Sequence, residues 1–363
     1  MDADVIIVGA GPAGLLLAGE LRLAGTTAIT LEKRGKPSGE SRGLGFTART
    51  MEIFRQRDIL KRFGEVTLSE RGHFGGIPID FSVLDGAEMA AKSVPQSHTE
   101  RVLEDWALEL GSEIRRGHEV TGFTEFANHV EVSVSGPQGA YKLQASYLVG
   151  ADGGRSTIRK LGSFPFPGTE STMEMFLADV QGLDLEPRMI GEILPGGMVM
   201  VGHLPNDVTR LIVCERRGTP PKRTVPLEFQ EVSQAWKRLT GVDISHGKPI
   251  WVSAFGNATR LVDMYSKGRV FLTGDSAHIH LPAGGQGMNV SLQDAMNLGW
   301  KLAAVCSGKA PLTLLESYNS ERRPVGERLM LNTQAQGLLF LSGPEIQPLR
   351  ELIRELTQIF HGD

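Results

Sequence analysis

The chain has 363 residues, of which 40% are hydrophobic and 22% charged, and it carries a formal net charge of −4 at pH 7. This composition is typical of a globular protein that is long enough for two packed domains. The slightly acidic balance argues against a nucleic-acid partner, because binding to phosphates needs a basic face. The two cysteines, Cys214 and Cys306, form no CxxC motif, which argues against disulfide exchange and cysteine-rich metal sites.

The first strand is expected within a few residues of Met1, which leaves no room for a signal peptide. No apolar run in the sequence approaches the roughly 20 residues that a membrane-spanning helix needs. We therefore expect a cytoplasmic protein without a membrane span.

An apolar run over 5–8 leads into the glycine turn 9–14, Gly-Ala-Gly-Pro-Ala-Gly, and helical spacing follows. This order predicts a strand, a tight turn and a helix, the first half of a βαβ unit that binds a dinucleotide. Gly9 permits the turn, Gly11 lets a pyrophosphate approach the backbone, and Gly14 lets the helix pack closely on the strand. The alternative is a turn that only joins strand to helix.

Glu32 follows a second short apolar run and stands where an acidic residue binds ribose hydroxyls. Its carboxylate would repel the 2′-phosphate of NADP, so the resident nucleotide is expected to be NAD or FAD. The glycines and charges of 33–45 then predict a loop. Arg42 in this loop is a candidate for contact with the pyrophosphate, and a solvated arginine is the alternative.

Helical spacing resumes over 47–63. Residues 97–100, Ser-His-Thr-Glu, form a capping-box pattern that predicts the start of another helix. The alternation of 130–134 predicts an edge strand, and a further strand is expected over 141–149. Between 164 and 258 the chain is rich in short β-like runs, with one helix near 227–239.

These patterns predict an α/β fold with two discontinuous domains. The first is a Rossmann-like dinucleotide-binding domain with C-terminal helices, and the second is built on a mainly antiparallel sheet. The expected boundaries are 1–72, 97–163 and 264–363 for the first domain, and 73–96 and 164–263 for the second.

Two later motifs place a carboxylate where a strand ends. Residues 147–156 run from an apolar strand into Asp152 and two glycines, and 268–278 run from another strand into Gly274 and Asp275. The alternatives are a turn role for Asp152 and a helix-capping role for Asp275.

In this order, the glycine turn, the Asp-Gly pair and the Gly-Asp pair resemble the single-component flavoprotein aromatic hydroxylases typified by p-hydroxybenzoate hydroxylase. The resemblance spans the chain. More narrowly, segments 39–50, 72–76, 195–198 and 277–282 look like bacterial polyketide hydroxylases, closest to those of angucycline pathways.

The resemblance implies that Asp275 binds the ribityl chain of FAD and that Asp152 lies near the pyrophosphate and is linked to NAD(P)H use. It also implies a place near the ribityl chain for Gln96. Glycines before a helix starting at Asn289 would direct N–H groups at the reduced flavin. We expect contacts with FAD from Gly9, Gly11, Pro12, Ala13, Gly14, Glu32, Lys33, Arg34, Arg42, Gln96, Asp152, Asp275, Pro282, Gly285, Gly287, Met288 and Asn289.

By the same resemblance, NADPH reduces the flavin, O2 adds at C4a, and the hydroperoxide transfers its distal oxygen to a phenol of a polycyclic aromatic polyketide. Pro282 and Gly285 would form the surroundings of C4a, and no acid or base residue is assigned. The expected substrate pocket consists of Phe74, Gly75, Phe81, Met175, Met200 and Pro282. For the methionines, a place in the core is the alternative.

His278 and His280 form an HxH pair, but no third ligand has the spacing of a zinc site, so no metal is expected. The tryptophans lack the spacing of flavin halogenases, which disfavours halogenation. Baeyer-Villiger oxidation, a coupled dehydration and a flavin-binding chain without turnover stay open, as do NADH in place of NADPH and a homodimer. Polyketide hydroxylases of this type usually continue into a thioredoxin-like third domain. The sequence stops at Asp363, so we expect either that this domain is absent or that the sequence is a truncated one.

Overall fold

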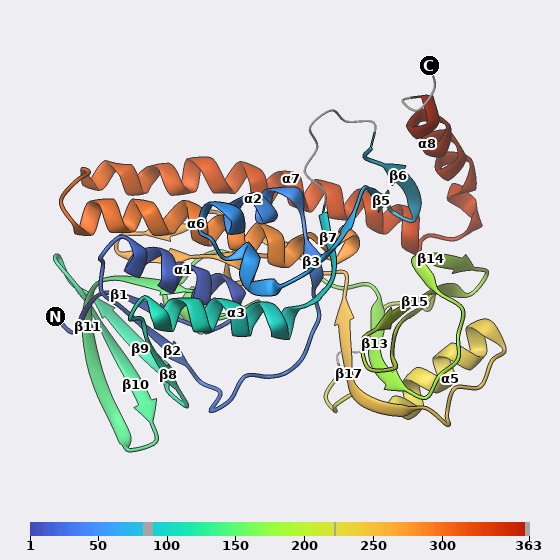
Figure 1. The fold of residues 1–363 in the computed structure, drawn as a ribbon, viewed down its shortest axis with the longest axis horizontal. Coiled ribbons are helices and arrows are strands. Elements are labelled where there is room, and N and C mark those ends of the chain that lie inside the picture. Colours follow the sequence, from blue (N-terminus) through green and yellow to red (C-terminus); the bar gives the residue numbers. More distant parts are fainter. Residues whose placement is uncertain (83–89, 221–222, 360–363) are drawn as a thin grey trace.

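A computed structural model describes residues 1–82, 90–220 and 223–359 of the chain. Its largest sheet has eight strands in the order β19-β20-β11-β1-β2-β8, with β10 and β9 continuing antiparallel from β11 (Figure 1). The strands β20, β11, β1, β2 and β8 are parallel. The bounds are β1 Ala3–Val8, β2 Ala28–Glu32, β8 Glu113–Arg116, β9 Glu119–Glu125, β10 Val130–Gly136, β11 Gly139–Gly150, β19 Ser266–Lys267 and β20 Val270–Leu272.

The prediction of an edge strand at 130–134 is wrong, because β10 pairs with β9 on one side and β11 on the other. The alternation in its sequence reflects one buried and one solvated face, which an internal antiparallel strand also has. The predicted α/β architecture itself is confirmed.

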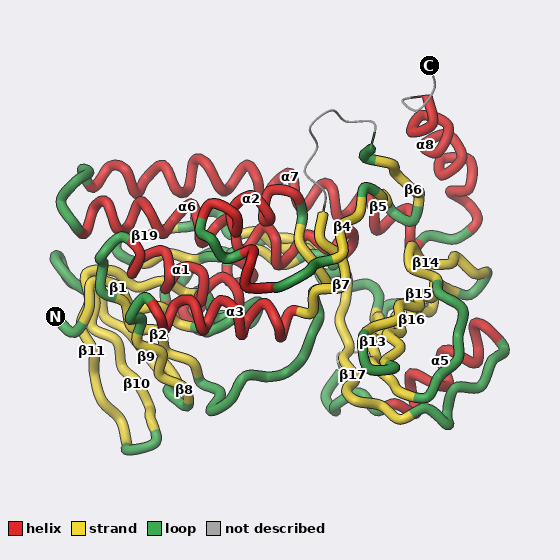
Figure 2. Tube along the Cα trace, viewed as in Figure 1, coloured by secondary structure: helices red, strands yellow, loops and turns green. Residues whose placement is uncertain are grey.

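Helices pack on the parallel sheet with their axes close together. α1 contacts both α3 and α6, and glycines allow the approach: a Cβ on Gly19 would lie 2.0 Å from Trp106, and one on Gly299 2.8 Å from the Cβ of Glu20. Figure 2 shows α6 and α7 as the two long helices above α1 and α3. The bounds are α1 Pro12–Leu23, α2 Ala48–Gln56, α3 Gln96–Glu109, α4 Thr157–Leu161, α6 Gln286–Cys306, α7 Glu316–Leu341 and α8 Gln347–Ile359.

The capping box predicted at 97–100 is not formed. α3 begins at Gln96 after the extended Pro95, so Ser97 lies inside the first turn, and its backbone N–H donates to the Ser41 hydroxyl at 3.2 Å. The local pattern predicted Ser97 as the N-cap of this helix, but in the structure Ser97 contacts Ser41 of a distant loop instead.

A second, antiparallel sheet has the order β14-β15-β16-β13-β17. On one face, Val199 and Val213 pack with Trp236 of the covering helix α5; their neighbours Met198 and Cys214 point to the other face. The bounds are β13 Glu174–Gln181, β14 Arg188–Leu194, β15 Gly197–Leu204, β16 Val208–Glu215, β17 Lys248–Gly256 and α5 Phe229–Thr240.

Short strands join these two bodies. One small sheet has the order β3-β7-β4, another β12-β18-β21, and β5 and β6 form a hairpin against α7 and α8. None of the helices in the described ranges is long and apolar enough to cross a membrane. The bounds are β3 Leu44–Phe46, β4 Thr67–Ser69, β5 Arg71–Phe74, β6 Ile77–Asp80, β7 Ala90–Pro95, β12 Gly168–Thr169, β18 Thr259–Leu261 and β21 His278–Ile279.

Candidate functional site

The glycine turn between β1 and α1 is packed on one side and open on the other. Gly9 has a φ of 109°, and a Cβ on Gly14 would lie 2.0 Å from the carbonyl oxygen of Gly9, so neither position accepts a side chain. A Cβ on Gly11 would meet no heavy atom within 4 Å. Pro12 and Ala13 open α1, whose N-terminus receives no side-chain cap. The turn therefore presents free space at the positive end of a helix, where an anion is stabilised.

Glu32 lies at the end of β2, beside this turn. Its Oε2 accepts from the backbone N–H of Ala10 at 2.9 Å, and its Oε1 accepts from the N–H of Arg34 at 2.9 Å. The carboxylate is half-buried, whereas Lys33 and Arg34 are exposed at the start of the following loop. The structure thus brings Glu32 to the glycine turn, as the spacing predicted.

The end of this loop crosses toward the second sheet. Arg42 is exposed, and its guanidinium lies 3.3 Å from the hydroxyl of Ser253 on β17. Next to it, the N–H of Gly43 donates to Oε1 of Gln96 at 3.2 Å, and a Cβ on Gly43 would lie 3.4 Å from Met288. Gln96 and Met288, far apart in sequence, therefore meet at this loop.

Asp152 is engaged within its own turn. Its Oδ1 accepts from the Ser156 hydroxyl at 2.5 Å, and its Oδ2 accepts from the backbone N–H groups of Thr157 at 2.6 Å and Ile158 at 3.2 Å. These bonds stabilise the start of α4 and engage both carboxylate oxygens. They match the turn role that the sequence left open as the alternative for Asp152.

Asp275 behaves differently. It is exposed between buried neighbours in the short turn 274–276, and no described residue lies within hydrogen-bond distance of its carboxylate. The capping alternative fails, because Thr273 is the N-cap of this turn, with its N–H donating to the Ser276 hydroxyl at 3.0 Å. Asp275 therefore presents a free acceptor at the carboxyl end of the parallel sheet.

The segment 282–289 forms the opposite wall of the site. Gly284 and Gly285 have φ values of 72° and 65°, and α6 begins directly after them. The helix start predicted at Asn289 is wrong by one turn, since α6 starts at Gln286. Asn289 is buried and braces this turn: its side chain donates to the Gly285 carbonyl at 2.9 Å and accepts from the N–H of Thr47 at 2.9 Å.

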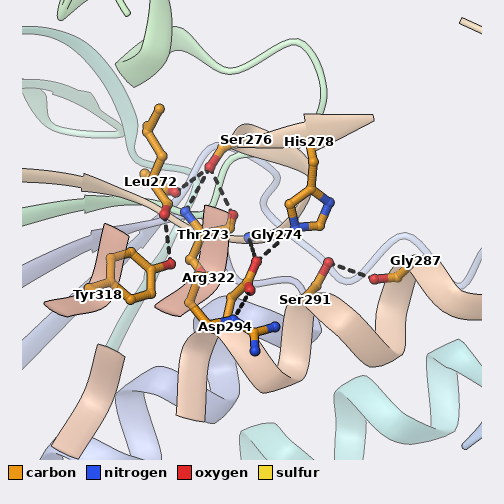
Figure 3. Close-up of polar contacts among 11 residues, drawn as sticks. Leu272, Thr273, Gly274, Ser276, His278, Gly287, Ser291, Asp294, Tyr318 and Arg322 are labelled. Atoms are coloured by element: carbon orange, nitrogen blue, oxygen red, sulfur yellow. Dashed lines mark hydrogen bonds and ion pairs between the residues drawn. The ribbon is translucent and has the colours of Figure 1, made fainter. Parts of the chain in front are cut away.

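A buried polar network that the sequence did not reveal supports the turn 274–276 (Figure 3). Asp294 of α6 is fully buried. Its Oδ1 accepts from Nε of Arg322 at 2.6 Å, and its Oδ2 lies 2.7 Å from Nε2 of His278 and 3.3 Å from the N–H of Gly274. Burial by itself would raise the pKa of Asp294, but the facing charges of His278 and Arg322 hold that pKa below its usual value.

The two histidines of the HxH pair therefore have separate surroundings. His278 is bound to Asp294, and Nδ1 of His280 donates to the Leu281 carbonyl at 2.7 Å. Burial, followed by the charge of His278, lowers the pKa of His280. Within the described ranges, no three His, Cys, Asp or Glu side chains are grouped so that they could hold a metal ion.

Arg159 is a second residue that sequence reasoning missed. It is buried, and its guanidinium donates to the Ser276 carbonyl at 2.9 Å and the Gly154 carbonyl at 2.8 Å, so it joins the Asp-Gly and Gly-Asp turns. For Asp294 a signal existed: it occupies the same helical face as the buried Val290 and Leu298, four residues away on either side. Arg159 had no comparable signal, because its partners are backbone carbonyls from distant segments.

Of the residues expected around a substrate, Met175, which is buried, and Met200, which is partly buried, belong to one core cluster on the face of the second sheet opposite α5. This cluster, which we call the methionine face, comprises Met173, Met175, Met198, Met200, Ile212, Cys214 and Phe255, and it packs on Leu281, Ala283, Phe340 and Leu341. The segment 281–283 thus carries the exposed Pro282 between two residues that contact the methionine face.

The β5–β6 hairpin lies next to this cluster. Phe74 ends β5, half-buried, and Gly75 lies in the hairpin turn, against α7. Phe81 is exposed and covers Gly72, whose added Cβ would lie 2.6 Å from the Phe81 ring. Phe81 is not part of the methionine face.

The FAD binding domain family matches residues 2–333. The chain belongs to this family. Among its relatives is 12-dehydrotetracycline 5-monooxygenase/anhydrotetracycline 6-monooxygenase of Streptomyces rimosus, which is 41% identical over 99% of this chain and 74% of its own length.

Solved structures extend the comparison. CabE, an aromatic hydroxylase from angucycline biosynthesis, is 60% identical with a TM-score of 0.97, covering 99% of this chain and 74% of CabE. The Diels-Alderase PyrE3 of pyrroindomycin biosynthesis is 35% identical with a TM-score of 0.89, covering 97% of this chain and 77% of PyrE3. Resemblance to the aromatic hydroxylases is thereby confirmed, and the chain is an enzyme of the FAD-dependent monooxygenase type.

The residues present fit FAD. The open space at Gly11 suits a pyrophosphate, the unpartnered carboxylate of Asp275 suits a ribityl hydroxyl, and the uncapped start of α6 directs backbone N–H groups where a reduced flavin ring would carry negative charge. The individual contacts with FAD are predictions.

Proposed function

We propose that the protein hydroxylates a polycyclic aromatic polyketide of the angucycline type, using FAD, NADPH and O2. The observation that supports this most is the packing of the methionine face on Leu281 and Ala283, which brackets Pro282. A broad, adaptable apolar wall next to the expected flavin position suits a large flat phenol. Similarity to CabE supports the substrate class.

When bound, FAD would supply the oxygen chemistry: with two electrons from NADPH, one atom of O2 would enter the aromatic ring and the other would leave as water. The chain's own residues bind and orient. Gly11 and the start of α1 would hold the pyrophosphate, Asp275 would hold the ribityl chain, and backbone N–H groups at the start of α6 would stabilise charge on the ring. The methionine face excludes water from the reacting atoms.

We also propose that the dinucleotide-binding domain comprises 1–72, 97–163 and 264–363, and that 73–96 and 164–263 bind the substrate. NADPH then binds only transiently as the reductant. Glu32 would contact the ribose of the bound FAD and would not affect NADPH binding. The two parts contact each other at Arg42, whose guanidinium donates to the Ser253 hydroxyl on the second sheet at 3.3 Å.

The test uses purified protein, FAD, NADPH, ¹⁸O-labelled O2 and a tetracyclic angucyclinone phenol. We expect yellow protein, NADPH oxidation stimulated by the phenol, and a product that carries one labelled oxygen in a new hydroxyl group. Absence of stimulation would leave a flavin-binding chain without turnover. A labelled oxygen inserted into the ring skeleton, or a product with loss of water, would instead indicate Baeyer-Villiger oxidation or a coupled dehydration.

A further inference from the structure

Gln336, near the end of α7, lies between two glycine turns that belong to different parts of the site. Its side chain is 2% exposed. Its Oε1 accepts from the backbone N–H of Gly75 in the β5–β6 hairpin at 3.2 Å, and a Cβ on Gly284 would lie 2.9 Å from its Nε2. One buried amide therefore contacts both the hairpin and the turn before α6.

The contact continues along a chain of amides. Nε2 of Gln336 donates to Oδ1 of Asn332 at 2.8 Å, and Nε2 of Gln286 donates to the same oxygen at 3.3 Å. The orientation of Gln336 is determined by its partners, since an N–H can only donate and Gly75 must therefore face the amide oxygen. The chain runs from the hairpin to the first residue of α6.

Both glycine turns are held tightly against α7. Gly75 and Gly284 have φ values of 58° and 72°, a region that favours glycine. A Cβ on Gly75 would lie 2.5 Å from the Cβ of Leu339. Because the backbone of each turn rests on the same stretch of α7, neither can move far without disturbing Gln336.

Phe340 extends this junction to the second sheet. Its ring lies 5.4 Å from the ring of His73 on β5, and a Cβ on Gly191 of β14 would lie 2.9 Å from it. Phe340 also belongs to the cluster that packs on the methionine face. The end of α7 thus contacts the hairpin, the methionine face and the turn 282–285 together.

We propose that Gln336 is a positioning residue that couples the hairpin 71–80 to the turn 282–285, so that substrate seated against the hairpin also orders the start of α6. This inference rests on the proposed function only in assigning a substrate to the hairpin. The physical link between the two segments is independent of any reaction. A residue that served only general stability would affect unfolding without linking the two segments.

The test compares Gln336→Met with Gln334→Met in the FAD-loaded protein. Methionine keeps the length of the side chain while removing its donor and acceptor, and Gln334 is exposed on the same helix. In Gln336→Met we expect backbone hydrogen exchange to accelerate about fivefold in both 71–80 and 282–288. The first segment loses the bond from Gly75, and the second loses the support that reaches Gln286 through Asn332. In Gln334→Met both segments should exchange as in the parent.

A second variant, Gln336→Glu, keeps the acceptor for Gly75 but loses the donor to Asn332. We expect 71–80 to stay protected while 282–288 exchanges faster. Faster exchange confined to 71–80 in Gln336→Met, or unchanged exchange in both segments, would overturn the proposal. If Gln336→Met does not fold, hydrogen exchange of Gln336→Glu in the segments 71–80 and 282–288 tests the proposal.

Turnover with NADPH and the tetracyclic phenol gives a further readout. For Gln336→Met we expect the KM for the phenol to rise about fivefold, matching the exchange data, while kcat for NADPH oxidation stays within about twofold. If the parent oxidises no phenol, the proposed function fails, yet the exchange results without substrate still decide whether the two segments are coupled. An unchanged KM together with unchanged exchange would leave Gln336 no positioning role.

Discussion

A buried carboxylate is stable only when donors replace the water that it has lost, and Asp294 meets this condition with three of them. One of the three is the N–H of Gly274, so the carboxylate also supports the turn that carries Asp275. The exposed Asp275 and the buried Asp294 thus have different tasks, which separate substitutions should distinguish.

Asp275→Ala should weaken FAD binding without unfolding the protein. The carboxylate has no partner among the described residues, so its removal costs the protein nothing, but it would remove the charge-assisted hydrogen bond that we propose to the ribityl chain. We expect a loss of about 1.5–3 kcal/mol in FAD affinity, measured by titrating apoprotein with FAD. Asp275→Asn, which keeps an acceptor oxygen, should lose less; equal affinity in all three proteins would refute the contact.

Asp294→Asn should mainly affect folding. It leaves the buried guanidinium of Arg322 without a compensating charge, which costs about 3–5 kcal/mol. The midpoint of urea unfolding should fall accordingly, with Asp275→Asn as the control that keeps the parental midpoint. A free energy of unfolding within about 0.5 kcal/mol of the parental value would mean that the network carries no net stability.

His280 gives a dependence on pH. Its pKa in the folded protein is lowered by burial, so below its usual value of 6.5 the unfolded chain takes up a proton that the folded state does not. Its neutral form therefore favours folding above that pH, and stability falls on acidification by up to about 1.4 kcal/mol per pH unit. Unfolding curves of the parent and His280→Gln between pH 8 and about 5 should diverge in this direction. Parallel curves would contradict the pKa shift.

At the scale of elements, the sequence correctly predicted the helices, strands and turns that depend on residues close together in the chain. The glycine turn, β1, β2 and α1 formed as expected because Gly9, Gly14 and the apolar runs act within a few residues of one another. The capping box at 97–100 and the edge position of 130–134 failed because each depends on a distant partner, Ser41 and β9 respectively. Arg159 was missed for the same reason, since the carbonyls of Gly154 and Ser276 that it binds belong to other segments.

The glycines of the first turn allow a matched pair of substitutions. Gly14→Ala places a Cβ 2.0 Å from a backbone oxygen and should destabilise the fold by about 3 kcal/mol or more. Gly11→Ala meets no protein atom, so stability should change by less than about 1 kcal/mol while FAD binding is lost. Thermal unfolding and flavin content measure the two effects. Retention of FAD by Gly11→Ala would place the pyrophosphate elsewhere.

At the scale of the whole molecule, the end of α7 joins parts that the sequence could not bring together. Composition located the methionines in the second sheet but left open whether they form core or pocket, because both uses have the same spacing. The structure places their cluster against Leu281 and Ala283, a contact between segments about 80 residues apart, which only the packing of the two sheets through α7 creates.

The position of the methionine face next to the proposed flavin site should make its methionines prone to oxidation. If the flavin lies where we propose and NADPH is consumed without substrate, hydrogen peroxide would form beside this wall of thioethers, and methionine is readily converted to its sulfoxide. We expect peptide mass spectrometry after such idle turnover to find sulfoxide at Met198 and Met200 even with catalase in solution. Catalase should protect Met264, which is 45% exposed and lies outside this wall. Cys214 should resist, because burial raises the pKa of its thiol to about 12 and keeps it protonated. The wall that we propose for a large aromatic substrate would therefore also accumulate methionine sulfoxide during turnover without that substrate.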